Sequence, residues 1–254
     1  MSTPSLARRA LAEFTGTGAL VAVVVGSGIM AGRLSPGDTG LELLENTLAT
    51  AAGLAVIIVV LGPVSGAHLN PLISAADWVL GRRGRTGLPA RDLAVYVPVQ
   101  VAGGIGGAVL ANLMFALPAA TASDRVRSAP HLWLGEVVAT AGLVLVVFGL
   151  ARSGRGRLAP AAVAGWIGAA YWATSSTSFA NPAVTIGRAF TDTFAGIARA
   201  SVPGFVAAQA AGAVAGVVLV LALFPAVRPG KADERPVPAR RDAAAVGVVP
   251  PAAG

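Results

Sequence analysis

Two of the four asparagines in this sequence, Asn70 and Asn181, stand directly before a proline. Asn is a favoured N-cap residue and Pro is favoured at the first helical position, so each pair predicts the start of a helix. The amide at such a start can donate hydrogen bonds to a solute oxygen, and the helix end adds roughly half a positive elementary charge. These residues could therefore bind uncharged, oxygen-bearing molecules and repel cations.

Each Asn-Pro pair precedes an apolar stretch of about half a membrane thickness, Asn70 to Leu80 and Asn181 to Phe190. One such pair alone also marks an ordinary turn. Irregular backbone beside a half-length helix is tolerated at membrane depth only where it is buried in protein or lines a water-filled cavity. Two half-helices with their N-termini at one midplane would form a barrier to protons and cations.

The elements that must position these motifs are membrane helices. The chain of 254 residues is 55% hydrophobic and only 12% charged, whereas a soluble domain carries about 25% charged residues. Six segments are long enough to cross a hydrocarbon core of about 30 Å, which needs roughly 20 residues. They lie near residues 10–32, 42–62, 92–117, 131–151, 159–177 and 201–224. The expected fold is an all-α membrane protein with six transmembrane helices and two re-entrant half-helices.

The two halves of the chain share an order of motifs, which predicts an internal repeat of residues 8–117 and 131–225. The matched pairs are Glu13 with Glu136, Gln100 with Gln209, Gly103 with Gly212, Gly107 with Gly216 and Asn70 with Asn181. Each half contains three crossings, so the second half must enter from the opposite side. Inverted repeats place their functional site near the midplane, where discontinuous helices meet. The glycines four apart indicate close helix packing.

The basic residues indicate the orientation. Fourteen of the 19 Lys and Arg residues fall on one side if the N-terminus is inside, as the positive-inside rule requires. The net charge of +7 therefore suggests contact with lipid headgroups rather than with nucleic acid. We expect both termini to be cytoplasmic, with a channel domain over 1–225 and a disordered tail over 226–254.

The composition disfavours enzymatic chemistry. There is no cysteine and there are two histidines, so thiolate metal sites, His-rich metal sites and cysteine nucleophiles are excluded. No set of a nucleophile with a base is present. We expect neither a cofactor nor a metal.

The motif segments resemble a known family. Segments 65–71 and 178–183 read SGAHLNP and SFANPA, and segment 12–17 reads AEFTGT. These are similar to the two signature loops and the opening motif of the aquaporin (major intrinsic protein) family, over about residues 8–225. The resemblance implies a pore in each protomer of a homotetramer in the cell's inner (plasma) membrane. It also implies the residues of the pore midplane, namely Asn70, Pro71, Leu72, Asn181, Pro182 and Ala183.

Two positions depart from the family pattern. Leu72 stands where alanine is usual, and it either fills space between helices or narrows the midplane. Val184 stands where most members have the arginine of the outer constriction. The next arginine, Arg188, lies one helical turn further on, as a charge at the outer mouth or as a structural pairing.

The outer constriction, or filter, can be carried over from the family by spacing. The implied positions are Thr50, Ala169, Ser178 and Val184, all small and none charged or aromatic. Such a filter resembles the arsenic-associated bacterial branch of the aquaglyceroporins. This resemblance implies a wide channel for water, glycerol-like polyols and undissociated metalloid hydroxides such as arsenite.

Other polar residues are open to two interpretations. Glu13 and Glu136 could form a proton relay, but the family uses such glutamates to hold the re-entrant loops, and Gln100 and Gln209 fit similar bonding. His68 could line the inner half of the pore or respond to pH. Tyr171 would reach the filter only if the fifth helix were displaced by two or three positions.

Two rival functions remain at this stage. A proton-coupled secondary transporter would share the inverted repeat and broken helices, but it needs acids along its pathway. A poorly conducting structural relative would show no gain in permeability.

Overall fold

The computed structural model describes residues 4–82 and 86–224. All regular structure in these two ranges is helical. The α-helices, in chain order, are α1 (Leu6–Leu34), α2 (Thr39–Ser65), α3 (Pro71–Gly81), α4 (Ala90–Met114), α5 (Pro130–Arg152), α6 (Ala159–Ala173), α7 (Pro182–Arg188) and α8 (Val202–Leu223). The tail predicted over 226–254 lies outside the described residues.

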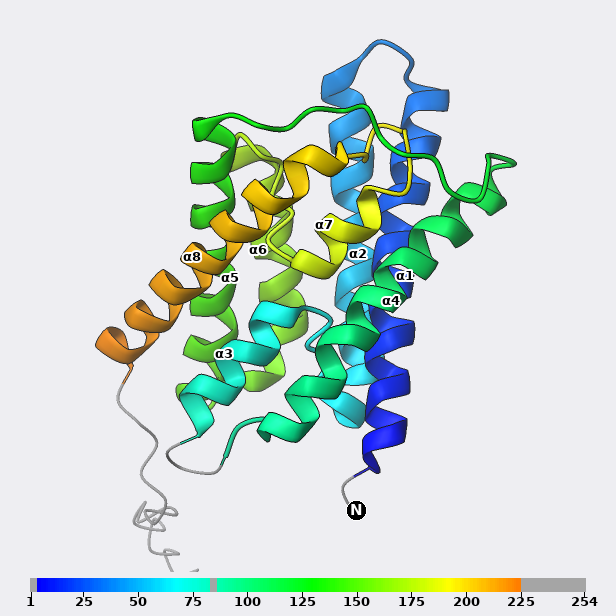
Figure 1. The fold of residues 1–254 in the computed structure, drawn as a ribbon. Helices are drawn as coiled ribbons and strands as arrows, with labels where there is room; N and C mark the ends of the chain where they lie inside the picture. Colours follow the sequence, from blue (N-terminus) through cyan, green and yellow to red (C-terminus); the bar gives the residue numbers. More distant parts are fainter. Residues whose placement is uncertain (1–3, 83–85, 225–254) are drawn as a thin grey trace, which may run out of the picture.

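The helices form two similar groups (Figure 1). Helix α1 packs along α4 in the first group and α5 packs along α8 in the second, while α2 lies against α6 between the groups. The short helices cross over, because α7 packs against α4 and α3 packs against α8. The start of α1 and the end of α8 lie at the same end of the molecule (Figure 1), as an even number of crossings requires.

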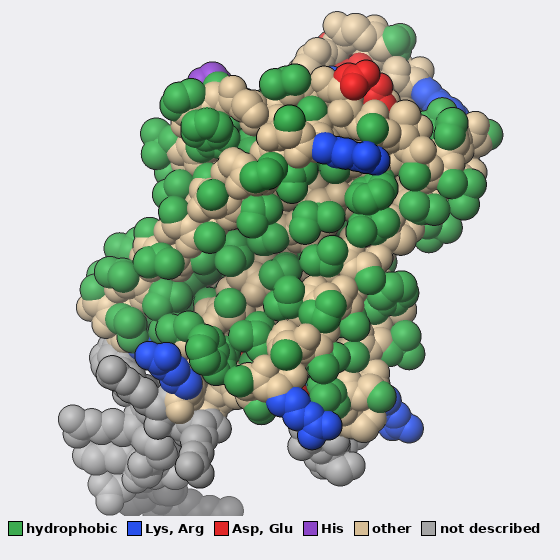
Figure 2. Space-filling model, in the orientation of Figure 1, with side chains coloured by type: hydrophobic (Ala, Val, Ile, Leu, Met, Phe, Trp, Pro, Cys, Tyr) green, Lys and Arg blue, Asp and Glu red, His purple; other side chains and the backbone are tan. Residues whose placement is uncertain are grey.

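The surface suits a membrane. Five helices of the described chain, α1, α2, α4, α5 and the segment Arg199–Leu223, are long and apolar enough to span a bilayer. Hydrophobic side chains cover the middle of the face in Figure 2, and Lys and Arg side chains lie near its ends. Exposed residues such as Val59, Leu113 and Val214 would be costly in water and are ordinary in lipid.

The fifth predicted span, 159–177, is shorter than expected. Helix α6 has 15 residues and ends at Ala173, which gives about 22 Å of helix at 1.5 Å per residue. The chain then enters a run of Thr and Ser, whose hydroxyls compete for backbone groups: Thr174 Oγ1 donates to Ala170 O at 2.7 Å, and Thr177 has a φ of 60°. The rest of the crossing is made by irregular chain that leads to α7.

Both half-helices begin where the Asn-Pro pairs predict. Asn70 caps α3 and Asn181 caps α7, each in an extended conformation. The loops before them hold non-glycine residues at positive φ, including Leu69 at 52° and Ala180 at 47°. Such conformations cost of order 1–3 kcal/mol each and persist only when the surroundings hold them. Something buried must therefore fix these two loops.

Glycines allow the long helices to touch. A Cβ at Gly107 of α4 would collide with the carbonyl oxygen of Gly18 in α1, and one at Gly212 of α8 would collide with Val137 of α5. These are the glycines that the repeat predicted to be packing positions. Backbones at this distance leave no room for the next larger side chain.

We predict that Gly107→Ala destabilises the protein, because neither backbone can move without disturbing the α1–α4 contact. Gly106→Ala in the same helix is the matched control, since its Cβ would meet only the Phe14 ring at 4.0 Å. Alanine there should be neutral or stabilising by up to about 1 kcal/mol. Thermal unfolding in detergent measures both, and equal unfolding temperatures for the two variants would contradict the packing account.

Candidate functional site

A cavity of about 260 Å³ runs between the two groups of helices, and we refer to it as the central cavity. Its wall is mostly apolar, with side chains such as Leu20, Leu143 and Ile167, and both loops before the half-helices contribute to it. The predicted site residues that line it are Thr50, His68, Asn70, Ser178, Asn181, Val184 and Arg188.

The two Asn side chains cap the half-helices. Asn70 Oδ1 accepts from Leu72 N at 2.9 Å, and Asn181 Oδ1 accepts from Ala183 N at 2.9 Å. Each side chain thus satisfies a backbone donor at the first turn of its helix, which is the usual work of an N-cap. Both helices direct their positive ends at the central cavity.

The same two side chains also join the halves. Asn70 Nδ2 donates to Ala180 O at 2.8 Å, and Asn181 Nδ2 donates to Leu69 O at 2.7 Å. Each Asn therefore binds the loop that precedes the other. An amide nitrogen carries two hydrogens, so each keeps a second N–H for an oxygen in the cavity.

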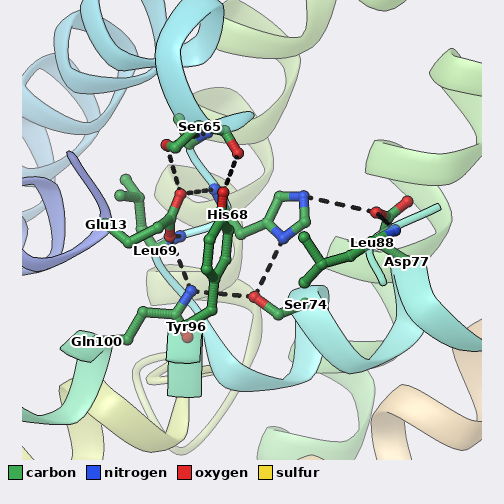
Figure 3. A network of polar contacts seen from close by, with 10 residues as sticks. Glu13, Ser65, His68, Leu69, Ser74, Asp77, Leu88, Tyr96 and Gln100 are labelled. Atoms are coloured by element: carbon green, nitrogen blue, oxygen red, sulfur yellow. Dashed lines mark hydrogen bonds and ion pairs between the residues drawn. The ribbon is translucent and has the colours of Figure 1, made fainter. Parts of the chain in front are cut away.

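Glu13 holds the first loop (Figure 3). Its Oε1 accepts from Ser65 Oγ at 2.6 Å and from His68 N at 3.0 Å. Its Oε2 accepts from Leu69 N at 2.6 Å and from Gln100 Nε2 at 2.8 Å. The carboxylate is fully buried, and four donors replace the water it has lost.

Glu136 repeats this arrangement in the second half. Its Oε1 accepts from Phe179 N and its Oε2 from Ala180 N, both at 2.8 Å. Gln209 Nε2 donates to the same Oε2 at 2.6 Å. The bonds of both acids to loop backbone support the loop-holding role predicted for them.

The glutamines extend each network to a hydroxyl on the half-helix. Gln100 Nε2 also donates to Ser74 Oγ at 3.0 Å, and Gln209 Nε2 donates to Thr185 Oγ1 at 2.8 Å. Sequence reasoning missed both hydroxyls. Each hydroxyl residue follows the Asn of its half by four positions. A comparison of the two repeats could therefore have identified them.

His68 lines the central cavity from the loop before α3, beside a carboxylate that sequence reasoning did not single out. Its Nδ1 is 3.1 Å from Ser74 Oγ, and its Nε2 is 3.9 Å from Asp77 Oδ2 (Figure 3). The ring packs edge-on against Tyr96. Asp77 also lines the cavity, and its Oδ2 accepts from Leu88 N at 2.8 Å.

The predicted filter requires one correction. Thr50, Ser178 and Val184 line the central cavity, but Ala169 does not and is exposed on the outer face of α6. Ile167 and Tyr171 of α6 line the cavity, and Tyr171 is 3% exposed. The count back from Asn181 crossed the irregular segment 174–180, so it did not identify the residues of α6 that face the cavity. The wall is therefore not free of aromatic side chains.

Arg188 is also part of the wall. Its guanidinium carbon lies 3.4 Å from the centroid of the Phe179 ring, and its Nε donates to Ala195 O. The side chain is buried, at 2% exposure, and lines the central cavity. The two sequence hypotheses for this residue, a charge at the mouth and a structural pairing, are therefore compatible.

The remaining motif residues lie behind the wall. Leu72 is partly buried and packs on the hydrophobic core, which favours space filling over a narrowed midplane. Pro71, Pro182 and Ala183 are buried in the first turns of α3 and α7. None of these four side chains is among the residues that line the central cavity.

Comparisons with known proteins agree with this architecture. A family model described as Major intrinsic protein matches residues 1–178. Aquaglyceroporin AqpS of Rhizobium meliloti is 50% identical over 224 residues, which cover 88% of this chain and 93% of that protein. A glycerol uptake facilitator protein of Pseudomonas aeruginosa is 32% identical over 62% of this chain and 63% of its own length. The aquaglyceroporin structure from Plasmodium falciparum matches with a TM-score of 0.63 and 21% identity, over 85% of this chain and 94% of that one.

We predict that Glu136→Gln destabilises the protein by on the order of 3 kcal/mol, because it removes a charged acceptor and sets an amide N–H against buried donors. Glu42→Gln is the control, since Glu42 is partly exposed, in the first turn of α2, and its carboxylate accepts no hydrogen bond from the described chain. Thermal unfolding and osmotic water permeability per protein measure the effect. Unchanged values for Glu136→Gln would show that this acid does not hold the loop.

Proposed function

This chain belongs to the major intrinsic protein family, and on that premise we propose that it passes water, glycerol-like polyols and undissociated metalloid hydroxides such as arsenite. In broader terms, the protein is a membrane channel for small neutral solutes such as water and glycerol, and it is not an enzyme. The observation that carries the finer proposal is Val184 in the wall of the central cavity, where most members of the family have arginine.

The cavity wall combines polar groups with an apolar side. The side-chain amides of Asn70 and Asn181 line the cavity, and each uses one hydrogen in a bond to the opposite loop. Val184 adds an apolar surface to the same wall. A solute with several hydroxyls, such as glycerol or arsenious acid, can bond to the amides and lay its less polar side on Val184. The similarity to an aquaglyceroporin at 50% identity supports solutes of this class.

The buried acids argue against proton coupling. A coupled transporter needs carboxylates that can release protons into the pathway. Glu13 and Glu136 do not line the central cavity and accept hydrogen bonds from loop backbone. Asp77 is the one acid among the described lining residues, and it is bonded to Leu88 N. A passive channel accounts for these positions better than a transporter does.

The assembly and its place in the cell form part of the same proposal. We expect a homotetramer in the inner (plasma) membrane with both termini in the cytoplasm. The positive-inside distribution of Lys and Arg supports that orientation, and the apolar outer faces of the helices suit lipid or a neighbouring protomer. Chemical cross-linking in membranes, followed by mass determination, tests the tetramer.

Stopped-flow light scattering of proteoliposomes tests the proposed solutes. Water, glycerol, urea and arsenite are compared in one preparation against empty liposomes. We expect glycerol and arsenite to enter faster than in empty liposomes, without saturation and without an ion gradient. Water permeation with no gain for glycerol or arsenite would contradict a wide filter, and no gain for any solute would favour the poorly conducting relative.

We predict that Val184→Arg lowers permeability to glycerol and arsenite more than permeability to water. The guanidinium narrows the cavity and places a second cation one turn from Arg188. Val184→Leu is the control, because it adds bulk without charge. Equal losses for all solutes in a folded Val184→Arg protein would show that position 184 does not set selectivity.

A further inference from the structure

The two half-helices carry opposite charges at equivalent positions of the repeat. Asp77 follows Asn70 by seven residues in α3, and Arg188 follows Asn181 by seven residues in α7. Both charged residues line the central cavity. Seven residues of α-helix span about 10 Å, which is about two turns. Each charge therefore stands well away from the Asn that begins its helix.

The two charges face different ends of the cavity. In Figure 1, α3 runs from the middle of the molecule toward the end that holds the start of α1, whereas α7 runs toward the opposite end. The two helices begin close together, because each capping Asn donates to the loop before the other helix. The carboxylate of Asp77 and the guanidinium of Arg188 therefore act on different parts of the cavity.

The protein holds one oxygen of Asp77 and leaves the other accessible. Oδ2 accepts from Leu88 N at 2.8 Å. The segment that carries Leu88 packs tightly on α3, since a Cβ at Gly87 would collide with Asp77 O. Oδ1 is not among the enclosed unpaired side-chain atoms, and no residue of 4–82 or 86–224 donates to it. The side chain is 29% exposed.

No arginine in the described part of the chain forms an ion pair with Asp77. Arg9 pairs with Asp92 at 2.6 Å, and Arg82 lies over an indole ring, 5.7 Å from its centroid. The side chain that approaches Asp77 is His68, whose Nε2 is 3.9 Å from Oδ2. An imidazole that is neutral above about pH 7 leaves the charge of a neighbouring carboxylate uncompensated.

A carboxylate at this place offsets an attraction that the midplane creates. The N-terminus of a helix is equivalent to roughly half a positive elementary charge, and α3 and α7 both direct theirs at the cavity. The potential that opposes cations there attracts anions, and Arg188 adds to it from the same wall. Fixed charges act strongly where little water screens them, so a carboxylate beside the path of an anion opposes its entry.

We propose that Asp77 is a specificity-determining residue that excludes anions at the end of the central cavity nearer the start of α1. The inference rests on the proposed channel function. A weak acid such as a metalloid hydroxide then enters as the neutral molecule, whereas its conjugate anion is opposed by the carboxylate. The two half-helices in this way divide the exclusion of ions between a positive midplane and a negative end.

The test measures chloride entry and glycerol entry in the same proteoliposomes, at about pH 8, where unperturbed imidazoles are neutral and carboxylates are ionised. A trapped dye reports chloride, which is driven by a potassium gradient with valinomycin, and light scattering reports glycerol. Asp77→Asn removes the charge and keeps an oxygen for Leu88 N. It should raise the ratio of chloride to glycerol entry by about tenfold, as expected for one unit charge a few ångströms from the path.

Two further variants serve as controls. Asp77→Glu keeps the charge and should keep the ratio near that of the wild type. Asp124→Asn removes an exposed acid that does not line the central cavity, and it should leave the ratio unchanged. The ratio does not depend on how much of the channel is folded.

A ratio in Asp77→Asn that stays within about twofold of the wild type, or that rises equally in Asp124→Asn, would overturn the proposal. If Asp77→Asn does not fold, Asp77→Ser carries the same test with the same expected rise. A wild-type channel that passes no glycerol would refute the proposed function. A channel that passes glycerol but shows no rise in chloride entry without the Asp77 charge would refute this inference alone.

Discussion

Two stretches of non-helical backbone, 66–69 and 174–180, lie inside a protein that is otherwise built for lipid. Backbone N–H groups at membrane depth must find partners within the protein. Glu13 and Glu136 supply them, each from the long helix that opens its half. A buried carboxylate is costly unless it is fully bonded, so each acid needs its loop as much as the loop needs the acid. The rest of the structure depends on these hydrogen bonds between the loops and the two glutamates, because they fix where the half-helices begin.

Much of this arrangement was predictable because it follows from local chemistry repeated twice. Asn before Pro predicts a helix start, and the inverted repeat predicts that two such starts meet. The residues of the filter were harder to predict from the sequence. Ala169 was wrong because a count of positions cannot pass through the irregular segment 174–180, whose path depends on hydroxyl bonds such as that of Thr174. Arg188 stayed ambiguous because the direction of its side chain depends on the Phe179 ring, which comes from another loop.

The structure separates two tasks along the cavity. In the proposed function, the ends of α3 and α7 and the two Asn amides oppose cations at the midplane without any charged side chain. Beside α7, Tyr171, Val184 and Arg188 line the same cavity. Val184 alters the wall beside α7 and leaves the Asn-Pro pairs of the midplane unchanged. A channel of this kind can become more permissive for neutral solutes without losing its barrier to ions.

The central claim is that one pathway conducts neutral solutes and rejects protons, and simultaneous recording of both fluxes tests it most directly. Proteoliposomes with a trapped pH dye are given a glycerol gradient and, in the same preparation, an imposed membrane potential. The account predicts rapid glycerol entry with proton flux no greater than in empty liposomes. Proton flux that rises in proportion to the protein, or glycerol entry that stops when the proton gradient is collapsed, would contradict it.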